Sequence, residues 1–364
     1  MTTDLSGVRQ NRTELQEAIE ELAASGFLGV QLRVNDERGE WVGSAGRREL
    51  KGDAAPLTDG HFRIGSSTKS FVATVVLLLV DEGRLGLDHQ VADLLPEFGI
   101  DRRITVRMLL QHTSGIFNHT GELYEDGTVV LGVPWQGKEW VDNRFRTYLP
   151  EELVRLSLAE PVRFAPGAGW SYANTNYVLA RLVIERVTGR PFAEELRRLV
   201  LEPLGLTGTV APGASAELPE PHNHGYYRYE DGGRQRTIDV TRQNPSWVGA
   251  GGDLISTTRD LHIYFSALMG GRLLPARLLA EMRSPEATVG YGLGVFAQQT
   301  AAGPVFHHNG ATMGSAALMY GSADGRTTLT AGLTWVDDAE LSIAPAFASA
   351  QQRLVEAVFC GTLA

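Results

Sequence analysis

A serine and a lysine three residues apart stand at the start of a long apolar run, within the stretch Phe62–Phe71. If a helix begins near Ser66, this spacing places the Ser66 hydroxyl and the Lys69 amine on one helical face. The amine could then take the hydroxyl proton, and the helix dipole would favour the negative charge that develops. The pair therefore predicts an activated serine nucleophile. The alternative is that Ser66 or Ser67 only caps the helix and that Lys69 is a surface cation.

Lysine is a rare residue in this chain. Of the 33 basic residues, only Lys51, Lys69 and Lys138 are lysines. A lysine can lose its proton when it is buried, whereas an arginine stays charged. Because the chain otherwise uses arginine, the lysine at position 69 is an unusual choice where proton transfer would need an amine. The composition therefore favours the catalytic interpretation.

Two further short stretches carry polar side chains. The stretch Gly169–Asn176 leads into a helix and places the Tyr172 hydroxyl two residues before the Asn174 amide. The stretch His307–Ala311 ends a strand at a glycine-bearing turn. Taken alone, the first would be a helix cap with a packed tyrosine, and the second an ordinary strand end. Since no third His, Asp or Glu stands at ligand spacing from His308, we expect no metal site.

The remaining pattern predicts an α/β fold in which an antiparallel sheet, built from both ends of the chain, is flanked by helices. Strands are expected at 27–34, 40–45, 226–229, 291–296, 305–308, 316–320 and 327–333, and helices at 11–24 (capped by Thr13), 66–81, 106–110, 174–187, 192–200, 258–269, 275–283 and 343–359. Residues 1–65 and 225–364 would form this α/β domain, and residues 66–224 a mainly helical domain, with the active site in the cleft between them. The long segment 117–148 would form one wall of that cleft or a packed surface flap.

Composition limits the possible partners. A net charge of −10 argues against nucleic acids and anionic membranes, and the longest apolar run, 75–80, is too short to span a bilayer. The polar N-terminus has no visible signal peptide, so we expect a cytoplasmic protein, or a secreted one if a leader precedes this sequence. The single cysteine, Cys360, excludes an internal disulfide and a C-x-x-C site. The oligomeric state stays open.

Taken together, the three stretches resemble the motifs of the penicillin-recognising serine enzymes, which comprise class C-type serine β-lactamases, penicillin-binding DD-peptidases and related esterases. The S-x-x-K motif matches Ser66–Lys69, Y-x-N matches Tyr172–Asn174, and H-x-G matches His308–Gly310. The motifs follow in the family's order, and the resemblance extends from about Phe27 to Cys360. The flanking residues look especially like those of the secreted soluble D-alanyl-D-alanine carboxypeptidase/transpeptidase.

The resemblance implies catalytic roles. Ser66 would be the nucleophile that forms an acyl-enzyme. Lys69 and Tyr172 would share proton handling, and which of them is the acylation base stays open. His308 would complete the hydrogen-bond network where many relatives have lysine. Asn174 would bind the amide oxygen of the substrate or hold Lys69 in place.

The resemblance also implies residues that bind the substrate. The backbone N–H groups of Ser66 and Ala311 would form an oxyanion hole. Gly310 would let the substrate backbone lie along the strand. Asn309 belongs to the same motif, and Trp247 matches a tryptophan that lines the cleft in the relative.

The sequence departs from the DD-peptidase pattern where those enzymes bind the terminal carboxylate of the substrate. That relative uses an arginine and two threonines, but residues 296–307 contain no Arg or Lys, and Asn309 and Ala311 replace the threonines. Cys360 has no partner for the relative's disulfide. We therefore expect the acylation machinery without the carboxylate-binding residues.

The sequence thus predicts a serine acyl hydrolase or acyltransferase that needs no cofactor. It would act on an amide or ester of a small molecule or peptide, with water or an amine as acceptor, for example in secondary-metabolite biosynthesis. One alternative is a D-alanyl-D-alanine carboxypeptidase or class C-like β-lactamase. The other is a non-catalytic binding or scaffold descendant of the fold.

Overall fold

The largest sheet has nine strands in the part of the chain that the computed structural model describes, residues 12–361 without 125, 287 and 339–343. The main path of strands is β2-β1-β13-β12-β10-β9, β11 pairs with β12, and the β6–β7 hairpin joins at β13. The strands of this sheet are β1 Phe27–Asp36, β2 Gly39–Gly46, β6 Tyr226–Asp231, β7 Arg234–Asp239, β9 Phe296–Thr300, β10 Gly303–His307, β11 Gly310–Thr312, β12 Ser315–Ser322 and β13 Thr328–Asp338. Its pairings are antiparallel, except that β6 runs parallel to β13. Two short pairs lie outside it: β3 Phe62–Arg63 with β8 Ile255–Ser256, and β4 Gly121–Leu123 with β5 Val129–Leu131.

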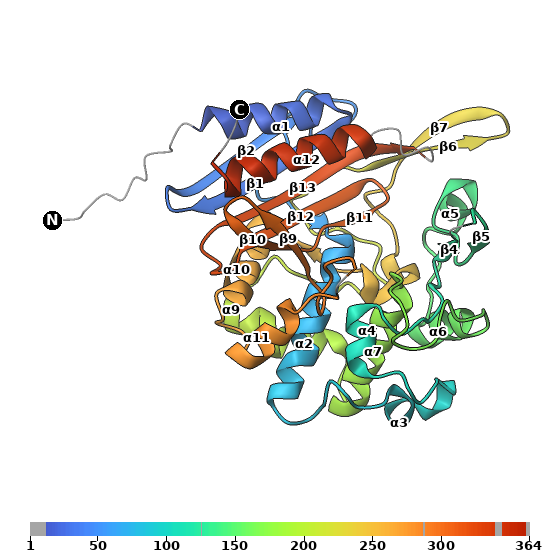
Figure 1. The fold of residues 1–364 in the computed structure, drawn as a ribbon. Helices are drawn as coiled ribbons and strands as arrows, with labels where there is room; N and C mark the ends of the chain where they lie inside the picture. The colour runs from blue at the N-terminus through green and yellow to red at the C-terminus, as the bar shows by residue number, and fades with distance from the viewer. Residues whose placement is uncertain (1–11, 125, 287, 339–343, 362–364) are drawn as a thin grey trace.

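Helices cover both faces of this sheet (Figure 1). They are α1 Thr13–Ala24, α2 Thr68–Asp81, α3 Val91–Leu94, α4 Val106–Gln111, α5 Gly137–Asn143, α6 Pro150–Leu158, α7 Asn174–Thr188, α8 Phe192–Leu196, α9 Glu202–Leu204, α10 Thr258–Met269, α11 Ala276–Arg283 and α12 Ala344–Phe359. The terminal helices α1 and α12 lie side by side on one face, and α10 packs on the other (Figure 1).

Strand β1 shows why the sheet needs cover on both sides. Its alternate residues Val30, Leu32 and Val34 are fully buried in the apolar cluster shared with α1 and α12. The residues between them, Gln31 and Arg33, are also buried but hydrogen-bond on the opposite side, to the Gly60 carbonyl and to Thr258 of α10. The strand therefore alternates in polarity although both of its faces are covered.

Helix α2 begins directly after Ser67, carries Lys69 and is packed among other helices. Its residues Phe71, Val75 and Leu79 are fully buried in the largest apolar cluster, and the helix contacts α7 and α8. A helix that is apolar on all sides is expected to be enclosed by others.

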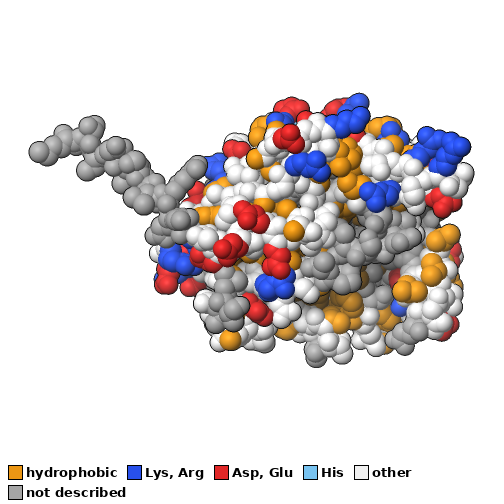
Figure 2. Space-filling view, turned by 90° about the horizontal axis from the view of Figure 1, so that it is seen from above, with side chains coloured by type: hydrophobic (Ala, Val, Ile, Leu, Met, Phe, Trp, Pro, Cys, Tyr) orange, Lys and Arg blue, Asp and Glu red, His pale blue; other side chains and the backbone are white. Residues whose placement is uncertain are grey.

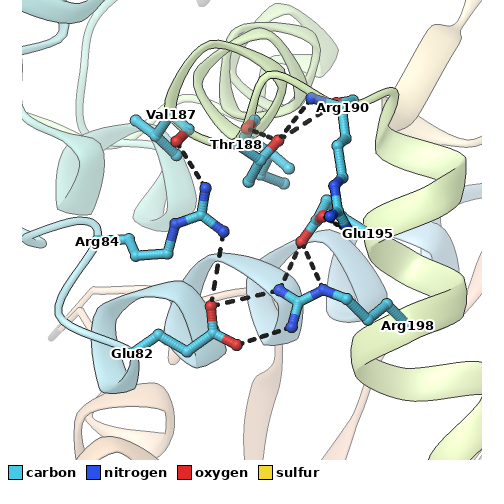
Figure 3. Close-up of polar contacts among 8 residues, drawn as sticks. Glu82, Arg84, Val187, Thr188, Arg190, Glu195 and Arg198 are labelled. Atoms are coloured by element: carbon cyan, nitrogen blue, oxygen red, sulfur yellow. Dashed lines mark hydrogen bonds and ion pairs between the residues drawn. The ribbon is translucent and has the colours of Figure 1, made fainter.

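An ion-pair network fixes the far end of α2 (Figure 3). The Arg198 guanidinium contacts Glu82, just after α2, and Glu195 of α8. Arg84 donates a hydrogen bond to the Val187 carbonyl of α7 at 2.9 Å. The network joins the C-terminal end of α2, the helix that carries Lys69, to α7 and α8.

The predicted α/β fold, with an antiparallel sheet flanked by helices, is confirmed, and α10 occupies the predicted range 258–269. Thr13 is the first residue of α1 rather than its cap, because Arg12 precedes the helix. The predicted strand 291–296 is wrong: Tyr291 and Phe296 face each other across a turn, and β9 begins only at Phe296. The segment 117–148 contains β4, β5 and α5. The division into two domains remains a prediction.

The surface carries charges of both signs. Figure 2 shows acidic and basic side chains interspersed over the face formed by α1 and α12. Within the described residues, no helix is both long enough and apolar enough to cross a membrane.

Candidate active site

Ser66 lies in a short 3₁₀ turn, Gly65–Ser67, which leads directly into α2. Ser66 is half-buried, whereas its neighbours in the turn are buried, so its hydroxyl is the one that a substrate can reach. Neither serine caps a helix through its side chain. The Ser67 hydroxyl instead donates a hydrogen bond to the His308 carbonyl at 2.6 Å. Ser67 thus occupies the position before α2 but forms no capping hydrogen bond with its side chain.

Lys69 is the centre of the site. Its side chain is fully buried, and Nζ lies 3.2 Å from Ser66 Oγ. Nζ also lies 2.7 Å from Asn174 Oδ1 and contacts the Gly251 carbonyl. Two N–H groups of Lys69 can bind the Asn174 and Gly251 oxygens. The remaining direction on Nζ, a lone pair in the neutral amine, then faces the Ser66 hydroxyl.

Asn174, the first residue of α7, holds this amine in place. Its Oδ1 accepts from Lys69, and its Nδ2 donates to Thr120 Oγ1 at 3.2 Å. Its backbone N–H donates to Asn118 Oδ1 at 3.0 Å. Both ends of the amide are therefore engaged, and residues of the 117–148 segment orient it.

The surroundings of Lys69 disfavour its charged form. Burial holds the pKa of Lys69 well below its usual value, and the negative charge of Asp253 opposes this effect in part. Asp253 is itself buried, and burial raises the pKa of its carboxyl. The amine is thus placed where it can be neutral and accept a proton.

Tyr172 lies against the same amine, with Nζ of Lys69 4.6 Å from the centre of its ring. Burial raises the pKa of Tyr172 well above its usual value, although a hydrogen bond with Ser66 lowers it in part. The phenol therefore carries its proton at neutral pH and is suited to donate it rather than to accept one.

His308 follows β10 and is buried, with its ring held at both nitrogens. Nδ1 lies 2.9 Å from the Asn309 carbonyl, and Nε2 lies 3.1 Å from the Tyr291 hydroxyl. Since a carbonyl can only accept, the proton is assigned to Nδ1, and Nε2 accepts from the tyrosine. Burial, as the main cause, lowers the pKa of His308 to about 3, so the ring is neutral.

The backbone of Gly310 and Ala311 is in close contact with the turn that carries Ser66. A Cβ atom at Gly310 would lie 2.0 Å from the Ile64 carbonyl oxygen and 2.5 Å from the Ser66 nitrogen. A Cβ atom at Gly65, which has a φ of +50°, would lie 2.5 Å from the Ala311 nitrogen. The two backbone segments can approach this closely only because both positions are glycine. The segments that carry the Ser66 and Ala311 nitrogens, the expected oxyanion donors, therefore lie against each other.

The other two predicted binding residues have structural contacts. Asn309 directs its amide to β12, where Nδ2 donates to the Tyr320 hydroxyl at 2.7 Å. Trp247 is mostly buried, and its carbonyl accepts from His119 Nε2 at 3.1 Å. The Asn309 amide is thus engaged with β12 rather than with Lys69. The roles of Asn309 and Trp247 in binding a substrate stay predictions.

Three residues that the sequence did not predict complete the site. The Gly251 carbonyl binds Lys69, the Tyr291 hydroxyl binds His308, and the His112 ring packs on Tyr172. Gly251 lies in a stretch without a chemical motif. The stretch Gly290–Gly294 is one of the flanks that resemble the DD-peptidase, but the resemblance gives Tyr291 no role. His112 lies in a recognisable helix-ending turn, but its ring contacts are non-local.

Buried neutral histidines predict that acid destabilises the protein. The pKa is lowered by burial at five positions among the described residues: His112, His119, His262, His307 and His308. Unfolded histidines take up protons near pH 6.5. In the folded protein the pKa is lowered to about 4 for His119, His262 and His307 and to about 3 for His308, and the pKa of His112 is also lowered well below its usual value. The free energy of unfolding should therefore fall as pH drops from 6.5 to 5, by up to about 2 kcal/mol per ring.

Urea unfolding between pH 7.5 and pH 5 measures this loss. His262→Gln, which lies outside the Ser66 and Lys69 contacts, should flatten the dependence by removing one of the rings. A free energy of unfolding that stays constant or rises toward pH 5 would contradict the prediction.

Within the described residues, no three His, Cys, Asp or Glu side chains form a group that could hold a metal ion.

Comparisons with known proteins find relatives over most of this chain. Residues 15–338 match the family model described as Beta-lactamase. The structure of a D-stereospecific amidohydrolase from Streptomyces sp. is 37% identical, with a TM-score of 0.82, covering 96% of this chain and 99% of that one. The predicted resemblance to serine β-lactamases and penicillin-binding proteins is confirmed.

Two curated relatives match shorter parts. Esterase EstB of Burkholderia gladioli is 38% identical over 41% of this chain and 38% of its own length. Penicillin-binding protein 4 of Amycolatopsis lactamdurans is 32% identical over 42% of this chain and 36% of its own length. The chain spans between 38% and 63% of the length of the first curated relatives that it matches.

Proposed function

Because the chain belongs to the Beta-lactamase family, we propose that it is a serine hydrolase or acyltransferase that forms an acyl-enzyme on Ser66. The observation that carries this proposal is the 3.2 Å distance between Ser66 Oγ and the amine of the fully buried Lys69. A buried neutral amine can accept the serine proton, whereas a solvated ammonium cannot.

In the proposed reaction, Ser66 Oγ attacks the substrate's carbonyl carbon while its proton passes to Lys69 Nζ. The Ser66 and Ala311 N–H groups stabilise the oxyanion, an effect of about 3–4 kcal/mol per donor. Tyr172 gives its proton to the leaving amine or alkoxide and regains one from Lys69, so the bond to the leaving group breaks and an ester on Ser66 remains. Water or an amine then attacks that ester, releases the acyl group and restores the serine hydroxyl.

We assign the base in acylation to Lys69 rather than Tyr172. The raised pKa of Tyr172 makes the phenolate scarce at neutral pH, whereas the lowered pKa of Lys69 favours the neutral amine. We assign to Asn174 the role of holding Lys69 rather than binding the substrate, because its amide oxygen already accepts a hydrogen bond from Lys69. His308, neutral and held at both nitrogens, supports the network through hydrogen bonds rather than charge.

The proposed substrate is an amide or ester of a small molecule or peptide, with a D-amino acid in its acyl part as the first candidate. The 37% identity to a D-stereospecific amidohydrolase and the partial match to an esterase support this class. Residues 296–307 contain no Arg or Lys, which favours amides and esters over peptides that end in a free carboxylate.

Intact-mass measurement with a substrate panel tests the proposal. The wild-type protein and Ser66→Ala are exposed to p-nitrophenyl esters, D- and L-amino-acid amides and a penicillin, with and without an added amine. We expect the wild type alone to gain the mass of the acyl group on Ser66, and D-amides to turn over faster than L-amides. The product formed with the amine separates transfer from hydrolysis.

Other outcomes would support the alternatives. Release of D-alanine from an acyl-D-alanyl-D-alanine peptide as fast as from the best amide would favour a carboxypeptidase. A penicillin adduct that is quickly hydrolysed would favour a β-lactamase. Neither adduct nor turnover with any compound would favour a non-catalytic binding protein.

A further inference from the structure

His112 contacts the chain on both sides of Tyr172. It follows α4 in the left-handed conformation, with a φ of 63°. Its carbonyl accepts from the Ser171 N–H at 3.0 Å, and its Nδ1 accepts from the Ala173 N–H at 3.2 Å. Its ring lies on the Tyr172 ring, with centres 4.4 Å apart and planes inclined by 34°. The tyrosine is thus held by its two neighbours and by its own ring.

The hydrogen bonds of His112 fix its protonation. Nδ1 also lies 3.1 Å from Asn176 Nδ2, and the orientation of that amide follows from Asn176 Oδ1, which accepts from Ser114 at 2.6 Å. With two donors directed at Nδ1, that nitrogen is the acceptor and the proton is on Nε2. The ring is fully buried, and burial holds the pKa of His112 well below its usual value. His112 is therefore a permanent acceptor at neutral pH.

Tyr172 needs such support because Ser171, Tyr172 and Ala173 lie outside regular secondary structure, just before α7. No ladder of backbone hydrogen bonds fixes the direction of its side chain there. We propose that His112 is a positioning residue, which holds the Tyr172 ring against Lys69 and its hydroxyl toward Ser66, in the orientation that protonates the leaving group. This inference rests on the proposed function of Ser66, Lys69 and Tyr172.

Two substitutions separate the parts of this role. His112→Phe retains an aromatic ring but loses the acceptor for the Ala173 N–H. His112→Asn retains an acceptor and tolerates the left-handed backbone, but loses the ring. His89→Phe is the matched control, because the exposed His89 also accepts a backbone N–H through Nδ1, from Gly86 at 3.1 Å.

Two substrates with different leaving groups provide the readout. A D-amino-acid p-nitroanilide must receive a proton on its leaving nitrogen, whereas p-nitrophenolate leaves the matching ester without one. We expect His112→Phe to slow acylation by the anilide about 10- to 100-fold and acylation by the ester much less. His112→Asn should slow the anilide by about fivefold, and His89→Phe should change neither rate. A general packing defect would slow both substrates alike.

A double-mutant cycle with Tyr172→Phe completes the test. If His112 acts through Tyr172, the His112 substitutions should have little further effect on the anilide once Tyr172 is phenylalanine. Equal losses in both backgrounds, or equal losses for both substrates, would overturn the inference. If His112→Phe does not fold, the same cycle with His112→Asn decides. A wild-type protein that is never acylated on Ser66 would instead refute the proposed function.

Discussion

Replacing Lys69 with methionine is expected to lower the rate of Ser66 acylation about 10⁴-fold, at the upper end of what a general base contributes. Methionine fills a similar volume, so the buried position should stay packed. It offers no donor to Asn174 Oδ1 or the Gly251 carbonyl and no lone pair to the serine proton. Stopped-flow acylation with a p-nitrophenyl ester measures the effect.

Two comparisons make the Lys69 result specific. Lys69→Arg restores a cation but not a proton acceptor, so it should be as inactive as the methionine variant. Lys138→Met removes an exposed lysine paired with Asp142 and should leave the rate unchanged. In the wild type, activity should fall as pH drops through the lowered pKa of Lys69, because only the neutral amine can accept. A Lys69→Met variant within tenfold of the wild type would contradict the assignment of the base.

Replacing Gly310 with alanine is expected to lower acylation about 10²- to 10³-fold, as for the loss of one oxyanion donor. The added Cβ atom would lie 2.0 Å from the Ile64 carbonyl oxygen and 2.5 Å from the Ser66 nitrogen. Both neighbours are backbone atoms that cannot turn aside, so β11 or the Ser66 turn must move. Either shift separates the two N–H groups that would bind the oxyanion.

Gly52→Ala is the control for this change. A Cβ atom at Gly52 would meet its nearest neighbour, Glu49 Oε1, at an ordinary 3.4 Å, so acylation should stay at the wild-type rate. Thermal unfolding of both variants separates a displaced oxyanion site from a general loss of stability. Wild-type acylation by Gly310→Ala would show that the Ala311 and Ser66 nitrogens do not act together.

The sequence was sufficient to predict functional residues that are recognised by their residue type and lie a few positions apart. Ser66 and Lys69 share one helical turn, so their contact followed from local geometry. The contacts of Lys69 with Asn174 and Gly251 join residues 105 and 182 positions away, and only the folded chain shows them. The choice between two roles for Asn174 could therefore not be made from the sequence.

The wrong strand at 291–296 has a similar cause. Tyr291, Leu293 and Val295 alternate with glycines, which is the pattern of a half-buried strand. The chain instead turns, and Gly294, with a φ of +80°, lies so close to α2 that a Cβ atom would be 2.6 Å from that of Ala73. Tertiary packing decided the conformation. Strand β7 was missed because its residues are mostly exposed and polar, so it carries no apolar signal.

The hydrogen bond from Ser67 to the His308 carbonyl joins residues 241 positions apart in the chain. The turn that carries Ser66 is therefore synthesised long before the strand that carries Gly310. Until Ala311 has left the ribosome, the serine has no second N–H group beside it, however well the preceding helices have folded. We expect a nascent chain to remain unable to acylate until its last strands pair, so that the reactive serine appears only with the completed sheet.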